Sequence, residues 1–153
     1  MTRSAFENQY NRYSRYVYAI LIARLPHGQA EDVLQEVFLE AWKRLGDLRD
    51  DASFGQWVAA IARNKTVDYF RRLKPLQPLE DVHAGRSHEP DPILEALQKL
   101  PEAYRETLAM RFVEGLSGTE IAELTGHTHG SVRVNLSRGM ALLRERLGVK
   151  TNA

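Results

Sequence analysis

The side chains between residues 128 and 138 combine hydrogen-bonding groups that suit the edges of DNA bases. A helical wheel gathers them opposite an apolar line, and they are Thr128, Gly130, Ser131, Arg133, Val134, Asn135, Ser137 and Arg138. An arginine can grip guanine, an asparagine can pair with adenine, and a valine can touch a thymine methyl. A short capped helix from Ser117 to Gly126 comes before them. The pattern predicts a helix-turn-helix whose second helix enters a major groove; the alternative is an ordinary helical hairpin with a solvated face.

A second group of polar side chains surrounds one exposed leucine. Asp32, Gln35 and Glu36 share the face of a predicted helix that lies opposite its buried side, and Leu39 is on the same face. Acidic groups around an apolar anchor suit docking onto a basic helical partner, because the charges steer the encounter and the leucine is buried. A solvated face that carries one stray leucine is the alternative for this segment taken alone.

A third group lines up an aromatic ring, an amide and several cations. Trp57, Asn64, Asp68 and Arg71 recur at a spacing that stacks them on one helical stripe, and Lys65 and Arg72 flank it. Such a stripe could stack an unpaired base on the indole and hold phosphates with the cations, as binders of single-stranded DNA do. The alternative is that Trp57 is a core residue, the commoner place for a tryptophan on an amphipathic helix.

The sequence offers no set of groups for catalysis or metal binding. It has no cysteine, which excludes disulfides, thiolate zinc sites and a cysteine nucleophile. The five histidines are scattered over turns and the linker, and His127 and His129 lack a nearby third ligand. A turn-capping or phosphate-contacting role fits these two histidines better than a weak metal site. We therefore expect no enzyme activity, no cofactor, no metal and no small-molecule substrate.

The charges and the apolar residues point to a polyanion binder that works inside the cell. The formal net charge of +1 hides separate acidic and basic blocks, with one basic block near residues 63–74 and another near 133–150. The first ten residues lack the apolar core of a signal peptide, and no apolar run approaches the ~20 residues that span a bilayer. We expect a cytoplasmic protein without membrane insertion.

Helical periodicity predicts an all-α protein, since no stretch alternates like a strand. We expect the first helix to begin at a capping box of Ser4 and Glu7, and the second helix to bury Trp42. The third helix should be capped by Ser53, with Gln56 completing the box. In the second half, an Asp91 cap should open a helix that buries Ile93, and the next helix should point Phe112 inward.

The segment from Lys74 to Pro92 is rich in proline and acidic residues and has no periodicity, which is typical of a linker. The chain should therefore consist of two small helical domains, residues 1–74 and 92–153, joined by a flexible linker over residues 75–91. The helix-turn-helix lies in the second domain.

Taken in order, three segments resemble the functional regions of extracytoplasmic-function (ECF) sigma factors of the sigma-70 family. The segments are AEDVLQEVFLEAW, DDASFGQWVAAIARNKTVDYFRR and LPEAYRETLAMRFVEGLSGTEIAELTGHTHGSVRVNLSRGMALLRERL. They are similar, respectively, to the polymerase-binding, promoter-melting and upstream-element-binding regions. The D-x-x-Q-E pattern at Asp32, Gln35 and Glu36 is characteristic of the first region.

The resemblance implies a function for each group of residues. The face of Asp32, Gln35, Glu36 and Leu39 would dock on core RNA polymerase. The loop from Leu48 to Phe54, with Asn64 beneath it, resembles the pocket that captures a flipped base of the minus-ten element. The minus-ten set is Arg49, Ser53, Phe54, Trp57, Asn64, Lys65, Asp68, Arg71 and Arg72. The last helix would contact the minus-thirty-five element, and an anti-sigma factor would regulate the protein.

The main alternative is a dimeric helix-turn-helix regulator with a partner-binding domain at its N-terminus. It explains residues 100–147, but it gives no role to the acidic face or to the Trp57 stripe. The final helix would also end too soon after Leu147 to form a dimer zipper. We further expect the free protein to bind promoter duplex poorly, because its acidic linker and second helix compete for its basic faces.

Overall fold

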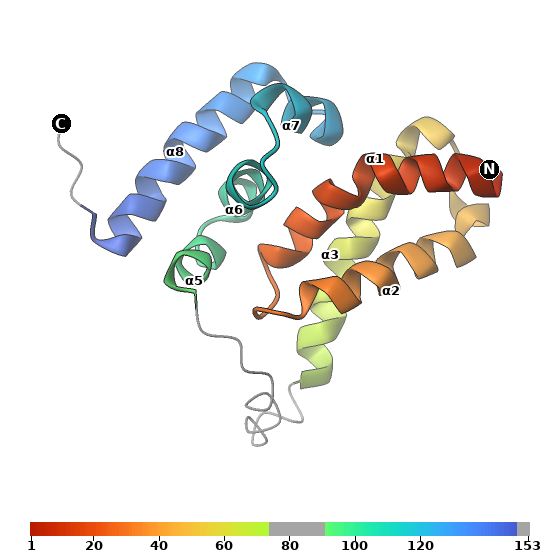
Figure 1. The fold of residues 1–153 in the computed structure, drawn as a ribbon, viewed down its shortest axis with the longest axis horizontal. Helices are drawn as coiled ribbons and strands as arrows, with labels where there is room; N and C mark the ends of the chain where they lie inside the picture. Colours follow the sequence, from red (N-terminus) through yellow and green to blue (C-terminus); the bar gives the residue numbers. More distant parts are fainter. Residues whose placement is uncertain (74–90, 150–153) are drawn as a thin grey trace.

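The computed structural model describes residues 1–73 and 91–149, and these residues form helices without any strand (Figure 1). The first bundle consists of α1 (Arg3–Ile22), α2 (Ala30–Lys43) and α3 (Phe54–Leu73), which pack on one another. The 3-10 turns η1 (Leu45–Asp47) and η2 (Asp51–Ser53) connect α2 to α3. The second bundle consists of α5 (Pro92–Gln98), α6 (Glu102–Leu108), the π-helical turn η4 (Ala109–Val113), α7 (Gly118–Thr125) and α8 (His129–Leu147). The all-α prediction is confirmed.

The core of the first bundle is aromatic near the start of α3. Phe54 has no exposed surface, and its ring lies 5.8 Å from that of Phe6 and 5.8 Å from that of Trp57. Asp50 accepts a hydrogen bond from the Ala52 amide at 3.1 Å, and the chain enters α3 through η2. The predicted cap at Ser53 is wrong, because Asp50 caps the preceding 3-10 turn instead. The first helix also begins differently, with Thr2 rather than Ser4 as its cap.

Local capping rules do account for the second bundle. The Asp91 carboxylate accepts from the amides of Ile93 and Leu94, and Pro92 occupies the first turn of α5. Ser117 and Glu120 form the predicted capping box at the start of α7. This helix ends at Gly126, whose φ of 78° is a conformation that glycine adopts without strain. The segment before α5, residues 74–90, carries most of the predicted linker and lies outside the described residues.

Three large apolar residues that we expected inside are exposed. Trp42 is 44% exposed, although its ring meets Phe6 edge-on at 5.1 Å. Ile93 is 57% exposed, because Leu94 and Leu97 are the residues of α5 that turn inward. Phe112 is 59% exposed because η4 changes the helical register: the Glu114 amide bonds to the Ala109 carbonyl, five residues back. A π turn rotates the following side chains away from the face an α-helix would give them.

The two bundles pack against each other. Helix α1 contacts both η4 and α7, and α3 also contacts α7. In Figure 1, α6 and α7 lie beside α1, while α2 lies on the far side of α1 and α3. The packing of one bundle on the other was not predicted from the sequence. It leaves α2 and the exposed face of α8 uncovered.

Candidate nucleic-acid and partner interfaces

The acidic face predicted on α2 is solvent-exposed. Asp32, Gln35, Glu36 and Leu39 are all exposed, and 59% of Leu39 is accessible. The opposite side of α2 carries Val33, Val37 and Ala41 into the core, so the helical period divides the two faces. Trp42 follows Leu39 by three residues and extends the apolar part of this exposed face. Sequence reasoning missed Trp42, because a tryptophan in an amphipathic helix is normally assigned to the core.

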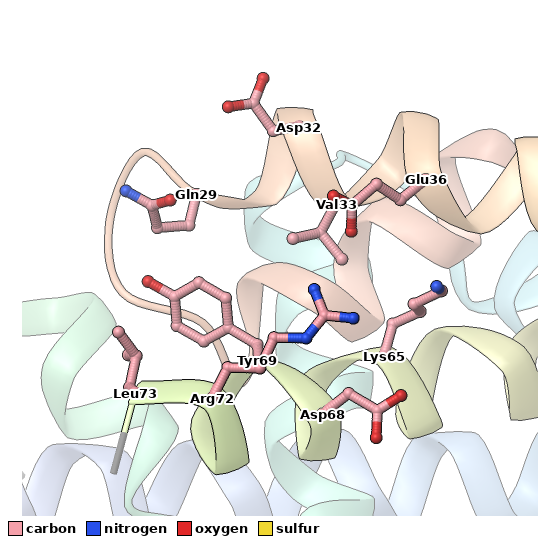
Figure 2. A pocket seen from close by; sticks show the side chains of 9 residues that line it. All are labelled: Gln29, Asp32, Val33, Glu36, Lys65, Asp68, Tyr69, Arg72 and Leu73. Atoms are coloured by element: carbon pink, nitrogen blue, oxygen red, sulfur yellow. The ribbon is translucent and has the colours of Figure 1, made fainter. Parts of the chain in front are cut away.

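The structure brings part of the acidic face together with part of the stripe on α3. A groove of about 290 Å³ between these helices is lined by Gln29, Asp32, Val33, Glu36, Lys65, Asp68, Tyr69, Arg72 and Leu73 (Figure 2). Lys65 also pairs with Glu40 of α2, with 3.4 Å between Nζ and Oε2. Carboxylates and cations therefore alternate across the groove. Lys65, Asp68 and Arg72 lie nearer to the acidic face than the sequence could indicate.

The remaining residues of the predicted minus-ten set lie along α3 and the loop before it. Arg49, Ser53, Asn64 and Arg71 are exposed, and Asp68 is half-buried with its carboxylate 3.7 Å from Arg71. Trp57 is half-buried because one side of its ring packs beside Phe54.

Phe54 is a correction to the predicted minus-ten set. Its side chain has no accessible surface, so it supports Trp57 from the core and offers nothing to a ligand. Val67, 54% exposed, lies on the same helical face as Asn64 and Arg71, and the sequence analysis did not include it. Phe70, 44% exposed on the same helix, was also left out. A large apolar residue at an outward position was the available signal for both.

The helix-turn-helix has an open outer face. Thr128 accepts a hydrogen bond from the Ser131 amide at 3.1 Å, which fixes the first turn of α8. Val132 and Leu143 are buried on the inner side of this helix. Most of the predicted recognition residues are exposed, namely Thr128, Ser131, Arg133, Val134, Ser137 and Arg138, whereas Gly130 and Asn135 are half-buried. The exposed set joins two guanidinium groups, two serine hydroxyls and an apolar side chain, which suits contact with base edges and phosphates.

Comparisons with known proteins agree with this division of the chain. Residues 9–75 match the family described as Sigma-70 region 2, and residues 91–143 match Sigma-70, region 4. The ECF RNA polymerase sigma factor SigM of Mycobacterium tuberculosis is 31% identical over 155 residues, covering 95% of this chain and 79% of SigM. The chain belongs to the ECF family of RNA polymerase sigma factors. Within this sigma factor, α2 and α3 lie in region 2 and the helix-turn-helix lies in region 4.

Two further relatives describe the breadth of the match. The probable RNA polymerase sigma factor RfaY of Xanthomonas campestris pv. campestris is 34% identical over 135 residues. This match covers 77% of our sigma factor and 34% of RfaY, so the chain spans about a third of that relative. The solved structure of CnrH in complex with the cytosolic domain of CnrY aligns with a TM-score of 0.56 and 25% identity. It covers 98% of this chain and 92% of the CnrH chain.

The described residues show no second kind of site. Among them, no group of three or more histidine, cysteine, aspartate or glutamate side chains is placed to hold a metal ion. Within residues 1–73 and 91–149, every helix is too short or too polar to cross a membrane.

Proposed function

We propose that this sigma factor brings core RNA polymerase to promoters by using separate surfaces for the enzyme and for DNA. The observation that carries the proposal is the exposure of two unlike faces on different helices. Asp32, Gln35, Glu36 and Leu39 of α2 form an acidic face with an apolar centre, whereas α8 presents Arg133 and Arg138. An acidic face repels DNA but attracts a basic protein surface, and an arginine face does the reverse. We assign α2 to polymerase and α8 to the minus-thirty-five element.

The stripe on α3 is proposed to act on the minus-ten element after its strands separate. Trp57 offers part of its indole for stacking, and Asn64 offers an amide with free access to solvent. Flipping a base out of the stack costs a few kcal/mol, which a stacking surface and a shaped pocket can offset. In this scheme the protein stabilises melted DNA and performs no covalent chemistry, and core polymerase supplies all of the catalysis.

The proposal extends to the location and regulation of the protein. Core polymerase and promoters place this sigma factor in the cytoplasm. CnrH, of similar fold and 25% identity, has been solved in complex with the cytosolic domain of CnrY. We propose that a protein inhibitor of the anti-sigma type binds this chain in a corresponding way and competes with core polymerase for the acidic face.

The decisive experiment is transcription in vitro with purified core polymerase on a library of genomic promoter fragments. Promoter-specific starts that require this protein are expected. A double variant, Asp32→Lys with Glu36→Lys, should lose both capture by core polymerase and transcription, because it reverses the charge of the face.

A matched control is Glu7→Lys with Glu145→Lys, which changes the net charge equally at exposed positions away from α2. The control should retain capture. If the folded α2 variant captures core polymerase as well as the control does, the acidic face is not the polymerase contact. If the wild-type protein directs no specific starts, the proposed function is wrong.

A further inference from the structure

A cluster of four charged residues joins the two bundles. Glu106 of α6 has 9% of its side chain exposed, and Arg63 of α3 grips its carboxylate with two nitrogens. The Arg63 Nη2 to Glu106 Oε1 distance is 2.8 Å, and the Nε to Oε2 distance is 3.1 Å. Arg24, just beyond α1, pairs with Glu106 as well and lies 2.8 Å from Glu102. We call Arg24, Arg63, Glu102 and Glu106 the polar latch, because each pair in it crosses from one bundle to the other.

Two glutamines strengthen this contact in a reciprocal way. Gln98 of α5 donates its amide to the carbonyls of Ile22 and Leu25, at 3.0 and 2.7 Å, where α1 ends. Gln56 of α3 donates to the carbonyl of Thr125 at 2.8 Å, where α7 ends. The last carbonyls of a helix lack partners within the helix. Each bundle therefore satisfies the exposed helix end of the other.

The electrostatics of the latch favour its charged form. Burial alone raises the pKa of Glu106, but the hydrogen bonds and charges of Arg63 and Arg24 outweigh it, so the net shift is downward. Burial lowers the pKa of the neighbouring Arg105, and the charge of Arg24 lowers it further. Burial also raises the pKa of Tyr16, which faces Arg63. A buried carboxylate between two arginines stabilises the contact while it is paired, and removing one partner leaves an uncompensated charge.

The packed arrangement is too short for a promoter. The two elements are named for positions about 25 base pairs apart, which is about 85 Å of duplex at ~3.4 Å per base pair. Gln56 adjoins Trp57 on the proposed minus-ten surface, and it touches Thr125 at the turn before the recognition helix. Helix α8 has 19 residues, so at ~1.5 Å per residue all of it lies within roughly 30 Å of that turn. The packed chain cannot occupy both elements together.

The polymerase-binding face does not share this restriction. Asp32, Gln35, Glu36 and Leu39 remain exposed while α1 and α3 carry the contacts between bundles. A polar interface between domains is also easier to separate than an apolar one, because water can take over its hydrogen bonds. The arrangement therefore permits polymerase to dock first and the bundles to separate afterwards.

We propose that the polar latch holds the free sigma factor in a closed state that cannot engage a whole promoter, and that binding to core polymerase opens it. The closed state itself follows from the contacts between the bundles. Its effect on promoter binding rests on the proposed function. This mechanism differs from the charge competition by the acidic linker that the sequence suggested, since it requires only described residues of the two bundles.

The absence of cysteine allows a direct test of the closed state. Asn8→Cys in α1 and Ala141→Cys in α8 are exposed positions, and a donor and acceptor dye on this pair reports the distance between the bundles. Energy transfer should be high in the otherwise unchanged chain and should fall when core polymerase is added. Glu106→Gln should lower it without polymerase and raise the affinity of the free protein for promoter duplex at least about tenfold.

Two further variants separate the latch from general damage. Glu102→Gln is the matched control, because it removes a similar carboxylate whose side chain is 58% exposed, and it should change the affinity less than about twofold. Arg63→Gln disturbs the latch from the other bundle and should change the transfer in the same direction as Glu106→Gln. Far-UV circular dichroism checks that each variant is folded.

The outcomes distinguish the latch from the proposed function. Unchanged transfer in both folded variants, or an equal effect of Glu102→Gln and Glu106→Gln, overturns the latch even if the wild-type protein directs transcription. A loss of transfer in Glu106→Gln and Arg63→Gln supports the latch even if no promoter-specific transcription is found, in which case the proposed function fails instead.

Discussion

Replacing Leu39 with alanine tests whether the acidic face on α2 has an apolar anchor for polymerase. Leu39 is 59% exposed in the free protein, so the substitution removes little packing and should change the free energy of unfolding by less than about 0.5 kcal/mol. Complete burial of a leucine side chain is worth about 1.5 to 3 kcal/mol. Because somewhat over half of this side chain is still available for burial, we expect a loss of about 1 to 1.4 kcal/mol in binding to core polymerase.

This loss corresponds to about a five- to tenfold weaker Kd, which fluorescence anisotropy with labelled sigma factor and core polymerase can resolve. Val67→Ala is the matched control, since Val67 is 54% exposed on α3, outside the groove that α2 and α3 form. It should leave the Kd within about twofold of the wild type. The reasoning is refuted if Leu39→Ala binds core as tightly as this control. A clear fall in thermal stability would instead show that Leu39 is a packing residue.

Three other predictions concern DNA and pH. Asn64→Ala should slow open-complex formation about tenfold on duplex promoters and much less on a pre-melted bubble, because only the duplex requires a base to be extracted; equal defects on both templates would make Asn64 structural. Arg133→Ala should cost about 1 to 3 kcal/mol and relax preference at one base pair of the minus-thirty-five element, whereas Arg146→Ala should give a small uniform loss. Equal, sequence-independent losses in transcription from promoter variants would mean that α8 senses only charge. The pKa of Glu106 lies below its usual 4.5, so the latch contributes fully above that pH and weakens as the pH falls through the pKa of Glu106 in the closed state. Energy transfer between the bundles should therefore be flat from pH 7 to 5 and fall below about 4.5, and a Glu106→Gln chain that loses transfer at the same pH would contradict this origin.

Most of the secondary structure follows from short-range signals. The Asp91 cap, the Ser117–Glu120 capping box and the glycine that ends α7 each act through residues within one helical turn, so spacing alone revealed them. The exposed faces of α2 and α8 were also predictable, because helical period determines which residues share a side. Phe112 shows the limit of this reasoning, since a single π turn is enough to move its side chain outward.

The candidate surfaces were harder to predict where burial depends on neighbouring helices. Phe54 and Trp42 are both aromatic residues at helix positions that sequence patterns assign with equal ease. Only the packing of α1 places Phe54 under the ring of Phe6 and leaves Trp42 at the edge of the bundle. The groove between α2 and α3 likewise depends on how two helices lie side by side. It joins residues that are more than thirty positions apart, such as Asp32 and Lys65.

The sequence by itself determined the helices, their caps, the helix-turn-helix and the family, because these are written in local spacing and in side-chain chemistry. Tertiary structure alone decided that the two bundles pack together and which side chains join them. Gln56 and Gln98 bind backbone carbonyls of the other bundle, and every residue has such a carbonyl, so no residue type in the sequence marks the partner. Glu106 is one of many acidic residues on amphipathic helices. Its special position arises because folding brings Arg24 and Arg63, from distant parts of the chain, onto one buried carboxylate.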